Sequence, residues 1–230
     1  MDAGAIWVTR AQPGAEATAR RIAALGRTAV VDPLLEIRSL DPLIDLTGVT
    51  ALAFTSVNGV AAFARLSPAR DLAGFTVGAA TAQAARAAGF ADPASADGDV
   101  AALAGLLIQA RPRLVLQAGA LTPAADLPAL LAAEGIAARA VAVYETLDRP
   151  PSSQTLADLD EMDAVLVHSP RAARCLATLL AANSVPHLRA LCLSTAVAAP
   201  LAGPAAEGRV GAVCVAAQPR ESALLALLQG

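Results

Sequence analysis

Short apolar runs alternate with helix-like stretches along the whole chain. The runs predict buried strands at residues 6–10, 28–31, 51–56, 75–78, 114–117, 137–146, 164–167, 191–193 and 212–215. The stretches between them carry apolar positions at helical spacing, and several end at a glycine such as Gly26, Gly89 or Gly135. Alternation of this kind is typical of parallel sheets with helices on both faces, so we predict an α/β fold.

Two of the predicted strands end at a serine that opens a helix. Ser56 follows one apolar run, and Ser169, with Pro170 behind it, follows another. Serine is a usual N-cap, and proline is favoured at the first helical position. Ligands of open α/β sheets bind at the carboxyl ends of strands, where helix N-termini attract anions. Ser56 and Ser169 are therefore candidate ligand contacts as well as candidate caps.

The same plan recurs with threonines. Thr81 is predicted to cap the helix after residues 75–78, and Thr195 opens the helix after residues 191–193. The two serines are 113 positions apart and the two threonines 114 positions apart. This spacing predicts a duplicated strand–helix unit.

The repeated units stand in a different order in the two halves, which predicts an inserted domain. We expect residues 1–34 and 149–230 to form a discontinuous α/β domain, with residues 39–141 as the inserted α/β domain. Residues 35–38 and 142–148 would cross between them and could pair as a two-stranded hinge. A ligand would then lie in the cleft that faces the strand ends of both domains.

Composition narrows the possible chemistry. All 17 basic residues are arginine, which excludes a Schiff-base lysine and a Gly-Lys-Ser/Thr phosphate loop. The net charge of −3 argues against nucleic acid as a partner. Three isolated cysteines and two histidines indicate neither a disulfide nor a metal site. No apolar run approaches the ~20 residues of a membrane helix, and the N-terminus lacks signal-peptide features, so we expect a soluble cytoplasmic protein.

The order and spacing of several short motifs resemble the uroporphyrinogen-III synthase family. The motifs are Val8-Thr-Arg10, Phe54-Thr-Ser-x-Asn-x-Val60, Val77-Gly-x-x-Thr-Ala82, Ala142-Val-Tyr144 and the second serine and threonine units. The resemblance implies two flavodoxin-like domains joined by a two-stranded ladder. It also implies a lyase without cofactor or metal that cyclises hydroxymethylbilane to uroporphyrinogen III, with loss of water and inversion of ring D. We expect this enzyme to be a monomer.

The resemblance also implies roles for single residues. Tyr144, the single tyrosine of the chain, matches the family's tyrosine that assists departure of the hydroxyl group. The predicted substrate contacts are Arg10, Ser56, Asn58, Thr81, Gln117, Gly119, Ser169 and Thr195. The sequence departs from the family pattern at Cys192-Leu-Ser-Thr195, where glycine is usual, and at residues 121–126, which lack a basic residue.

Other interpretations of the same residues stay open. Strict strand alternation would place Val141 and Val143 on one face and Tyr144 on the other, so Tyr144 could be a packing aromatic of the hinge. Arg10 and Arg171 could be solvated surface charges. A hinged cytoplasmic protein that binds a small anionic ligand is the alternative function. A nucleotide-dependent Rossmann enzyme would need Gly-x-Gly-x-x-Gly after the first strand, which the turn at residues 9–14 lacks.

Overall fold

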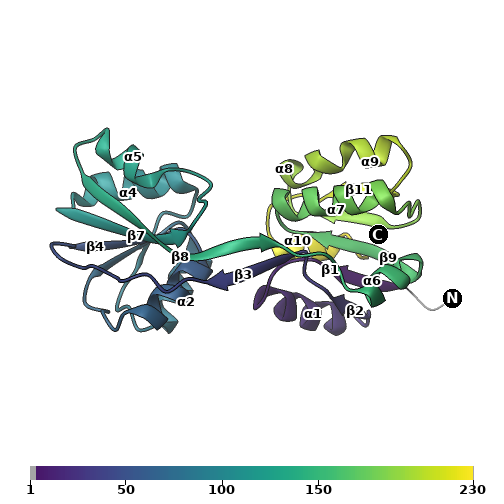
Figure 1. The fold of residues 1–230 in the computed structure, drawn as a ribbon, viewed down its shortest axis with the longest axis horizontal. Helices are drawn as coiled ribbons and strands as arrows, with labels where there is room; N and C mark the ends of the chain where they lie inside the picture. The colour runs from purple at the N-terminus through teal and green to yellow at the C-terminus, as the bar shows by residue number, and fades with distance from the viewer. Residues whose placement is uncertain (1–3, 230) are drawn as a thin grey trace. The chain divides into compact units, whose positions relative to one another are not determined.

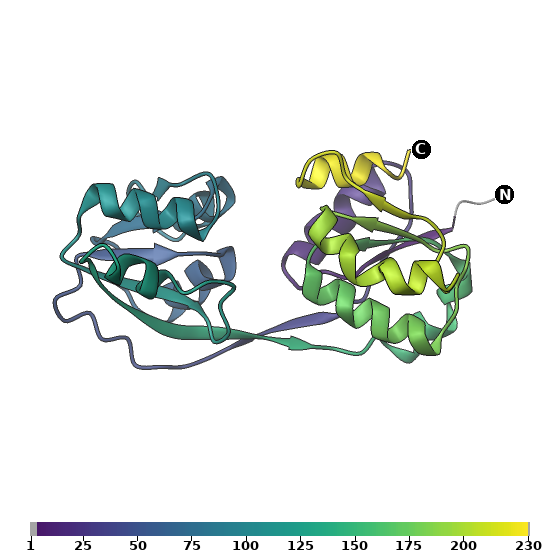
Figure 2. The ribbon, with the colours of Figure 1, turned by 90° about the horizontal axis from the view of Figure 1, so that it is seen from above.

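The predicted alternation of strands and helices produces two sheets of mainly parallel strands in the computed structural model, which describes residues 4–229. The chain divides into two compact units (Figures 1 and 2). Unit 1 contains the residues up to Glu36 together with those from Leu147 onward, and unit 2 is Ile37–Thr146. The colours in Figure 2 show that purple N-terminal elements belong with green and yellow C-terminal ones. The α/β fold class is confirmed.

The sheet of unit 1 contains the first two strands of the chain and the last three. Its order is β11-β10-β9-β1-β2, and every pair is parallel. Trp7 at its centre lies opposite Val30 on one side and Val165 on the other. The strands are β1 (Ala5–Val8), β2 (Ala29–Val31), β9 (Met162–Val167), β10 (Arg189–Cys192) and β11 (Val213–Val215).

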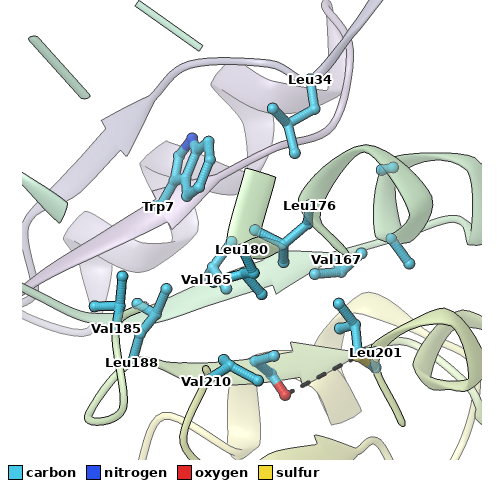
Figure 3. Close-up of a cluster of buried hydrophobic side chains, with 14 of the residues drawn as sticks. Trp7, Leu34, Val165, Val167, Leu176, Leu180, Val185, Leu188, Leu201 and Val210 are labelled. Carbon is cyan, nitrogen blue, oxygen red and sulfur yellow. Dashed lines mark hydrogen bonds between the residues drawn. The ribbon is translucent and has the colours of Figure 1, made fainter. Parts of the chain in front are cut away.

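Helices cover both faces of this sheet because alternate strand residues are apolar on each side. Figure 1 shows α7, α8 and α9 on one side and α1 on the other. The α7 side buries Trp7, Val165 and Leu176 (Figure 3), and the α1 and α10 side buries Ile6 and Leu166. The helices are α1 (Gly14–Ala24), α6 (Ser153–Ala157), α7 (Pro170–Ala182), α8 (Thr195–Ala198), α9 (Ala202–Ala206) and α10 (Glu221–Ala226), with 3-10 turns at Leu159–Glu161 and Ala199–Leu201.

The second sheet has the order β3-β8-β7-β4-β5-β6, with β3 (Leu35–Ser39) at one edge. The pairs from β8 to β6 are parallel. One face packs against α2 and α3 around Phe54 and Phe63, and the other packs against α4 and α5 around Leu103 and Leu127. The elements are β4 (Ala51–Phe54), α2 (Val57–Leu66), β5 (Ala73–Thr76), α3 (Ala79–Ala87), β6 (Ala94–Ser95), α4 (Val100–Ala110), β7 (Leu114–Ala120), α5 (Leu127–Ala132) and β8 (Ala137–Asp148).

The two sheets share one strand order with a shifted starting point. Unit 1 reads 2-1-3-4-5 in chain order, which is the flavodoxin-like order. Unit 2 reads the same when counting begins at β7, so β4 and β5 correspond to β9 and β10. This permutation explains why the repeated sequence units appear in a different order in the two halves.

Two strands carry the chain from one unit to the other. The unit boundary falls within β3 (Leu35–Ser39) and within β8, which are neighbours in the sheet order. In unit 2, the amide of Leu40 donates to the carbonyl of Val143 at 3.0 Å, and Arg38 forms an ion pair with Glu145. A hinge function of these strands stays a prediction.

Glycine conformations agree with the predicted helix ends. Gly26, Gly89 and Gly135 have φ values of +73°, +100° and +72°, which a residue with a side chain adopts only with strain. No helix within residues 4–229 combines the length and the apolar content that crossing a membrane requires.

The prediction that Thr81 caps its helix is wrong. Gly78 occupies the N-cap of α3, and Thr81 is a buried residue of the first turn whose amide donates to the Gly78 carbonyl at 3.0 Å. In the corresponding helix α8, Ser194 is the cap and Thr195 the first helical residue. Thr81 and Thr195 therefore occupy different positions of the repeated unit.

Candidate active site

Ser56 connects β4 to α2 at the carboxyl edge of the unit 2 sheet. Its backbone is extended, with φ −160° and ψ 156°, as is typical of an N-cap residue. Its Oγ accepts a hydrogen bond from the amide of Gly59 at 3.0 Å. This contact satisfies one of the unpaired amides at the helix N-terminus. The prediction that Ser56 caps its helix is confirmed.

Tyr144 of β8 reaches the same serine. Its Oη lies 2.9 Å from Ser56 Oγ, and either hydroxyl can donate. The residue is 7% exposed and packs in the cluster that contains Phe54 and Val60. The phenol is thus anchored in the core, while its oxygen points to the strand edge where α2 begins. Proximity of Tyr144 to Ser56 could not be inferred from their separation in sequence.

A β-bulge directs Tyr144 to this position. Gly119 of β7 pairs with Ala142, but the next residue of β7, Ala120, pairs with Tyr144, so Val143 is an extra residue in β8. The bulge interrupts the alternation, and Val143 and Tyr144 both lie buried in one cluster. The predicted placement of these two side chains on opposite faces is therefore wrong.

The first turn of α2 packs closely against β7. A Cβ added to Gly59 would lie 2.7 Å from the carbonyl oxygen of Ala118 and 3.4 Å from Ser56 Oγ. Only glycine leaves room for this approach. Gly59 was not predicted as part of the site, although an isolated glycine inside a helical pattern is a sign of close packing.

The other predicted contacts in unit 2 lie in β7 and in the first turns of α2 and α3. Gln117 and Gly119 are buried in β7, and a Cβ on Gly119 would lie 3.5 Å from Gln117 Nε2 and 3.8 Å from Thr55 Oγ1. Asn58 is half-buried in the first turn of α2, whereas Thr81 is 5% exposed in α3. Parallel pairing places these residues along one carboxyl edge.

The predicted contacts in unit 1 occupy the corresponding edge. Ser169 caps α7, and its Oγ accepts from the amide of Ala172 at 3.2 Å, as predicted for a cap. Thr195 is exposed at the first position of α8, behind the cap Ser194. Arg171 forms an ion pair with Asp148 at 2.6 Å on the exposed side of α7.

Arg10, at the end of β1, belongs to a polar cluster that the sequence did not reveal. Its Nη1 lies 2.6 Å from Glu221 Oε2, and Thr18 donates to Glu221 Oε1. His168 Nε2 lies 3.5 Å from Glu221 Oε2, which makes it a Coulombic neighbour rather than a strong hydrogen-bond donor. An acidic residue in the first turn of a helix is ordinary, so nothing in the sequence distinguished Glu221.

The cluster keeps Glu221 ionised. Burial of the carboxyl opposes ionisation, but the contacts with His168 and Thr18 and the charges of His168 and Arg10 lower the pKa of Glu221 to about 2. A carboxylate held in this state is a fixed anchor for a cation and a poor proton donor near neutral pH.

The described residues contain no cluster suited to binding a metal ion. No group of three or more His, Cys, Asp and Glu side chains within residues 4–229 is arranged to hold a metal ion. The cysteines are free thiols, and burial raises the pKa of the Cys192 thiol to about 12, with Cys214 nearby adding to the effect.

The sequence matches the model of one protein family. The sequence model described as uroporphyrinogen-III synthase HemD matches residues 16–226. A comparison with proteins of curated function returns no significant match.

Solved structures share the fold across the whole chain. The crystal structure of uroporphyrinogen-III synthetase from Helicobacter pylori is 17% identical, with a TM-score of 0.70, and 99% of this chain and 98% of that chain are covered. A mutant uroporphyrinogen III synthase from the extremely thermophilic bacterium Thermus thermophilus is 19% identical, with a TM-score of 0.58 and the same two coverages. At these identities the structures support the fold, and the family match supports the activity. The chain belongs to the uroporphyrinogen-III synthase family, the cyclising lyases of tetrapyrrole biosynthesis.

Proposed function

We propose that Tyr144 donates the proton that lets the hydroxyl group of hydroxymethylbilane leave as water. The observation that carries this proposal is the 2.9 Å contact between Tyr144 Oη and Ser56 Oγ at the carboxyl edge of the sheet. Because Ser56 Oγ already accepts from the Gly59 amide, its own hydrogen is available to donate to Tyr144. The phenol hydrogen is then free to point toward a substrate.

This hydrogen-bond chain suits general-acid catalysis. As the carbon–oxygen bond of the substrate breaks, the hydroxyl takes the phenol proton, and electrons of the adjacent pyrrole stabilise the carbon that remains. The Ser56 hydroxyl stabilises the developing phenolate, and the helix N-terminus behind Ser56 adds a partial positive charge. The bridge-bearing α-carbon of ring D bonds to the carbon that lost the hydroxyl group and gives a spiro intermediate. The bond from that α-carbon to the ring C methylene then breaks, and the methylene bonds to the free α-carbon of ring D. This carbon loses its proton as the ring regains aromaticity, and a proton returns to the Tyr144 phenolate. The net loss is one molecule of water.

The remaining edge residues are proposed to hold the substrate's carboxylates and pyrroles. Asn58, Thr81, Gln117 and Gly119 supply amide or hydroxyl groups, or close backbone access, in unit 2. Unit 1 supplies a guanidinium group and two further helix N-termini, through Arg10, Ser169 and Thr195. Carboxylates bind well to such N-termini and to arginine.

The proposed function also includes a cellular compartment and an oligomeric state for the protein. We place the protein in the cytoplasm, since Cys175, Cys192 and Cys214 are all free thiols, which is usual in a reducing compartment. A monomer without cofactor is the proposed working form, with units 1 and 2 as its two domains and β3 and β8 as the hinge.

Replacement of Tyr144 by phenylalanine tests the proton donor. The ring packing survives, but the proton is lost, so the rate of enzymatic closure should fall by about 10²- to 10⁴-fold. Because the linear substrate also closes without inversion, the product should shift toward the uninverted isomer. Rate and isomer ratio are measured with purified protein and hydroxymethylbilane.

The matched control is Thr76→Val, which removes another buried hydroxyl of the same sheet. Thr76 Oγ1 donates to the carbonyl of Ala94 at 3.1 Å, and among the hydrogen bonds of residues 4–229 none joins its side chain to Ser56 or Tyr144. This variant should lose some stability and keep the wild-type isomer ratio. Wild-type rate and isomer ratio in Tyr144→Phe would assign the proton to water or to the substrate instead.

A further inference from the structure

The guanidinium group of Arg10 lies between the backbone of Gly14 and the carboxylate of Glu221, and we call this arrangement the Arg10 seat. A Cβ added to Gly14, the first residue of α1, would lie 2.5 Å from Arg10 Nε and 2.7 Å from Cζ and Nη2. The side chain therefore lies against the bare backbone of Gly14, while Glu221 binds Nη1 from α10. Three separate elements, β1, α1 and α10, fix this one cation.

Two nitrogen atoms of Arg10, Nε and Nη2, donate no hydrogen bond to residues 4–229. Hydrogen bonds from Arg10 to residues 4–229 use only Nη1, which contacts Glu221 Oε2 at 2.6 Å and Thr18 Oγ1 at 3.5 Å. The Arg10 side chain is 34% exposed, so the Nε and Nη2 hydrogens are within reach of a ligand. These two hydrogens form the edge of guanidinium that binds a carboxylate with two parallel hydrogen bonds.

Glu221 is occupied from the protein side on both oxygens. Thr18 donates to Oε1, and Arg21 Nη1 lies 3.7 Å from that oxygen. Arg10 and His168 both approach Oε2. The His168 side chain is 9% exposed, and its ring nitrogens have no hydrogen-bond partner within the described part of the chain. The imidazole therefore lies beside the Glu221 carboxylate without a hydrogen bond to it.

The electrostatics of the seat favour an anion. A cation beside the N-terminus of α1 is unfavourable, because both carry positive charge, and the Glu221 carboxylate offsets this repulsion. An additional carboxylate would interact favourably with the Arg10 guanidinium.

From this geometry we propose that Glu221 is a positioning residue, which holds Arg10 with its Nε and Nη2 hydrogens ready for one carboxylate of the substrate. Gly14 supplies the space, and the hydrogen bond from Thr18 fixes the carboxylate of Glu221. The inference rests on the proposed role of Arg10 as a substrate contact. Glu221 acts through Arg10 and does not touch the substrate.

A double-mutant cycle tests this inference in the full-length protein. The variants are Arg10→Ala, Glu221→Gln and the combination, assayed with hydroxymethylbilane at a temperature at which circular dichroism shows all of them folded. Loss of the Arg10 contact should raise KM about 10- to 100-fold. Loss of orientation in Glu221→Gln should raise KM about three- to tenfold, with kcat within about twofold of wild type. In the Arg10→Ala background, Glu221→Gln should change KM no further.

Glu207→Gln is the control, because it removes a carboxylate that is also paired with an arginine of unit 1. Glu207 lies 2.5 Å from Arg209 and makes no contact with Arg10, so its KM should equal that of wild type. An unchanged KM in Arg10→Ala would refute the substrate role of Arg10 itself. A raised KM in Arg10→Ala with an unchanged or lower KM in Glu221→Gln would refute the positioning role alone. An equal rise of KM from Glu221→Gln in both backgrounds would show a general structural effect and would also refute it.

Discussion

Single residues of the site differ in how far the sequence revealed them. Ser56 follows from its place between an apolar run and a helix, and the structure confirms its capping contact. The family resemblance, rather than any pattern, singled out Tyr144, because its contact with Ser56 spans 88 positions and depends on a bulge. Glu221 and Gly14 gave no signal, since their importance arises from where three distant elements meet. Local patterns encode caps and strand ends, but tertiary packing creates such clusters.

At Gly59 the structure leaves no room for a larger side chain. In Gly59→Ala the new methyl would meet the Ala118 carbonyl at 2.7 Å, so α2 must shift away from β7. We expect a loss of about 1–3 kcal/mol of stability, together with reduced activity because Ser56 moves with the helix. Urea unfolding and the closure assay measure the two effects.

Gly105→Ala provides the comparison for that variant. Gly105 lies inside α4, and a Cβ there would meet nothing within 4 Å. Alanine should therefore stabilise the helix by about 0.5–1 kcal/mol and leave activity unchanged. Equal stability of the two variants would show that the close approach at Gly59 has no energetic consequence.

The sequence predicted a helix start correctly where a side chain caps the helix, and wrongly where the cap is a glycine. The side chains of Ser56, Asp99 and Ser169 mark helix starts, because a hydroxyl or carboxylate before a helical pattern has a direct physical role. Where the cap is Gly78, no side chain marks the helix start, so the sequence pointed wrongly to the nearest hydroxyl, that of Thr81. The buried strands were predicted because apolar runs report burial directly, whereas the edge strand β6 was not predicted as a strand, and β3 only as one part of a possible two-stranded hinge.

A comparison of the two helix caps Ser56 and Asp99 separates the effect of a lost cap on stability from its effect on catalysis. Ser56 Oγ and Asp99 Oδ1 each accept a hydrogen bond from a helix amide at 3.0 Å, in α2 and α4 respectively. Ser56→Ala and Asp99→Ala should each cost about 0.5–2 kcal/mol of stability. Only Ser56→Ala should slow the closure reaction, because it also removes the partner of Tyr144. Similar activities in the two variants would contradict the proposed hydrogen-bond chain.

At the scale of the whole molecule, the permuted strand order links sequence and architecture. The repeated serine and threonine units indicated duplication, and the sheet orders show how one flavodoxin-like order serves both units. Repeats were visible because each unit needs the same strand, cap and helix pattern. The path by which β3 and β8 carry the chain across could be placed only approximately, since the residues of β3 and β8 alternate imperfectly.

Acid stability should report the charged cluster of unit 1. The pKa of Glu221 is lowered to about 2 in the folded protein from its ordinary value of 4.5. A depressed carboxyl pKa contributes stability that is fully present above the unfolded value and is lost as the pH falls toward the folded value. Glu221→Gln should thus be less stable than wild type at neutral pH, and the difference should vanish between pH 4.5 and about 2.

Thermal unfolding of both proteins across this pH range measures the difference. Asp45 of unit 2, whose pKa the hydrogen bonds from Thr47 and Arg139 lower to about 2, is present in both proteins, so its contribution cancels. A difference in stability that stays constant down to pH 2 would show that Glu221 is not ionised preferentially in the folded state.

The isomer formed from hydroxymethylbilane tests the central claim most directly. The purified wild-type protein, supplied with this substrate and no added cofactor, should form uroporphyrinogen III, identified after oxidation as the uroporphyrin with ring D inverted. Substrate without protein should form the uninverted isomer. Formation of the uninverted isomer alone in the presence of active, folded protein would contradict the account.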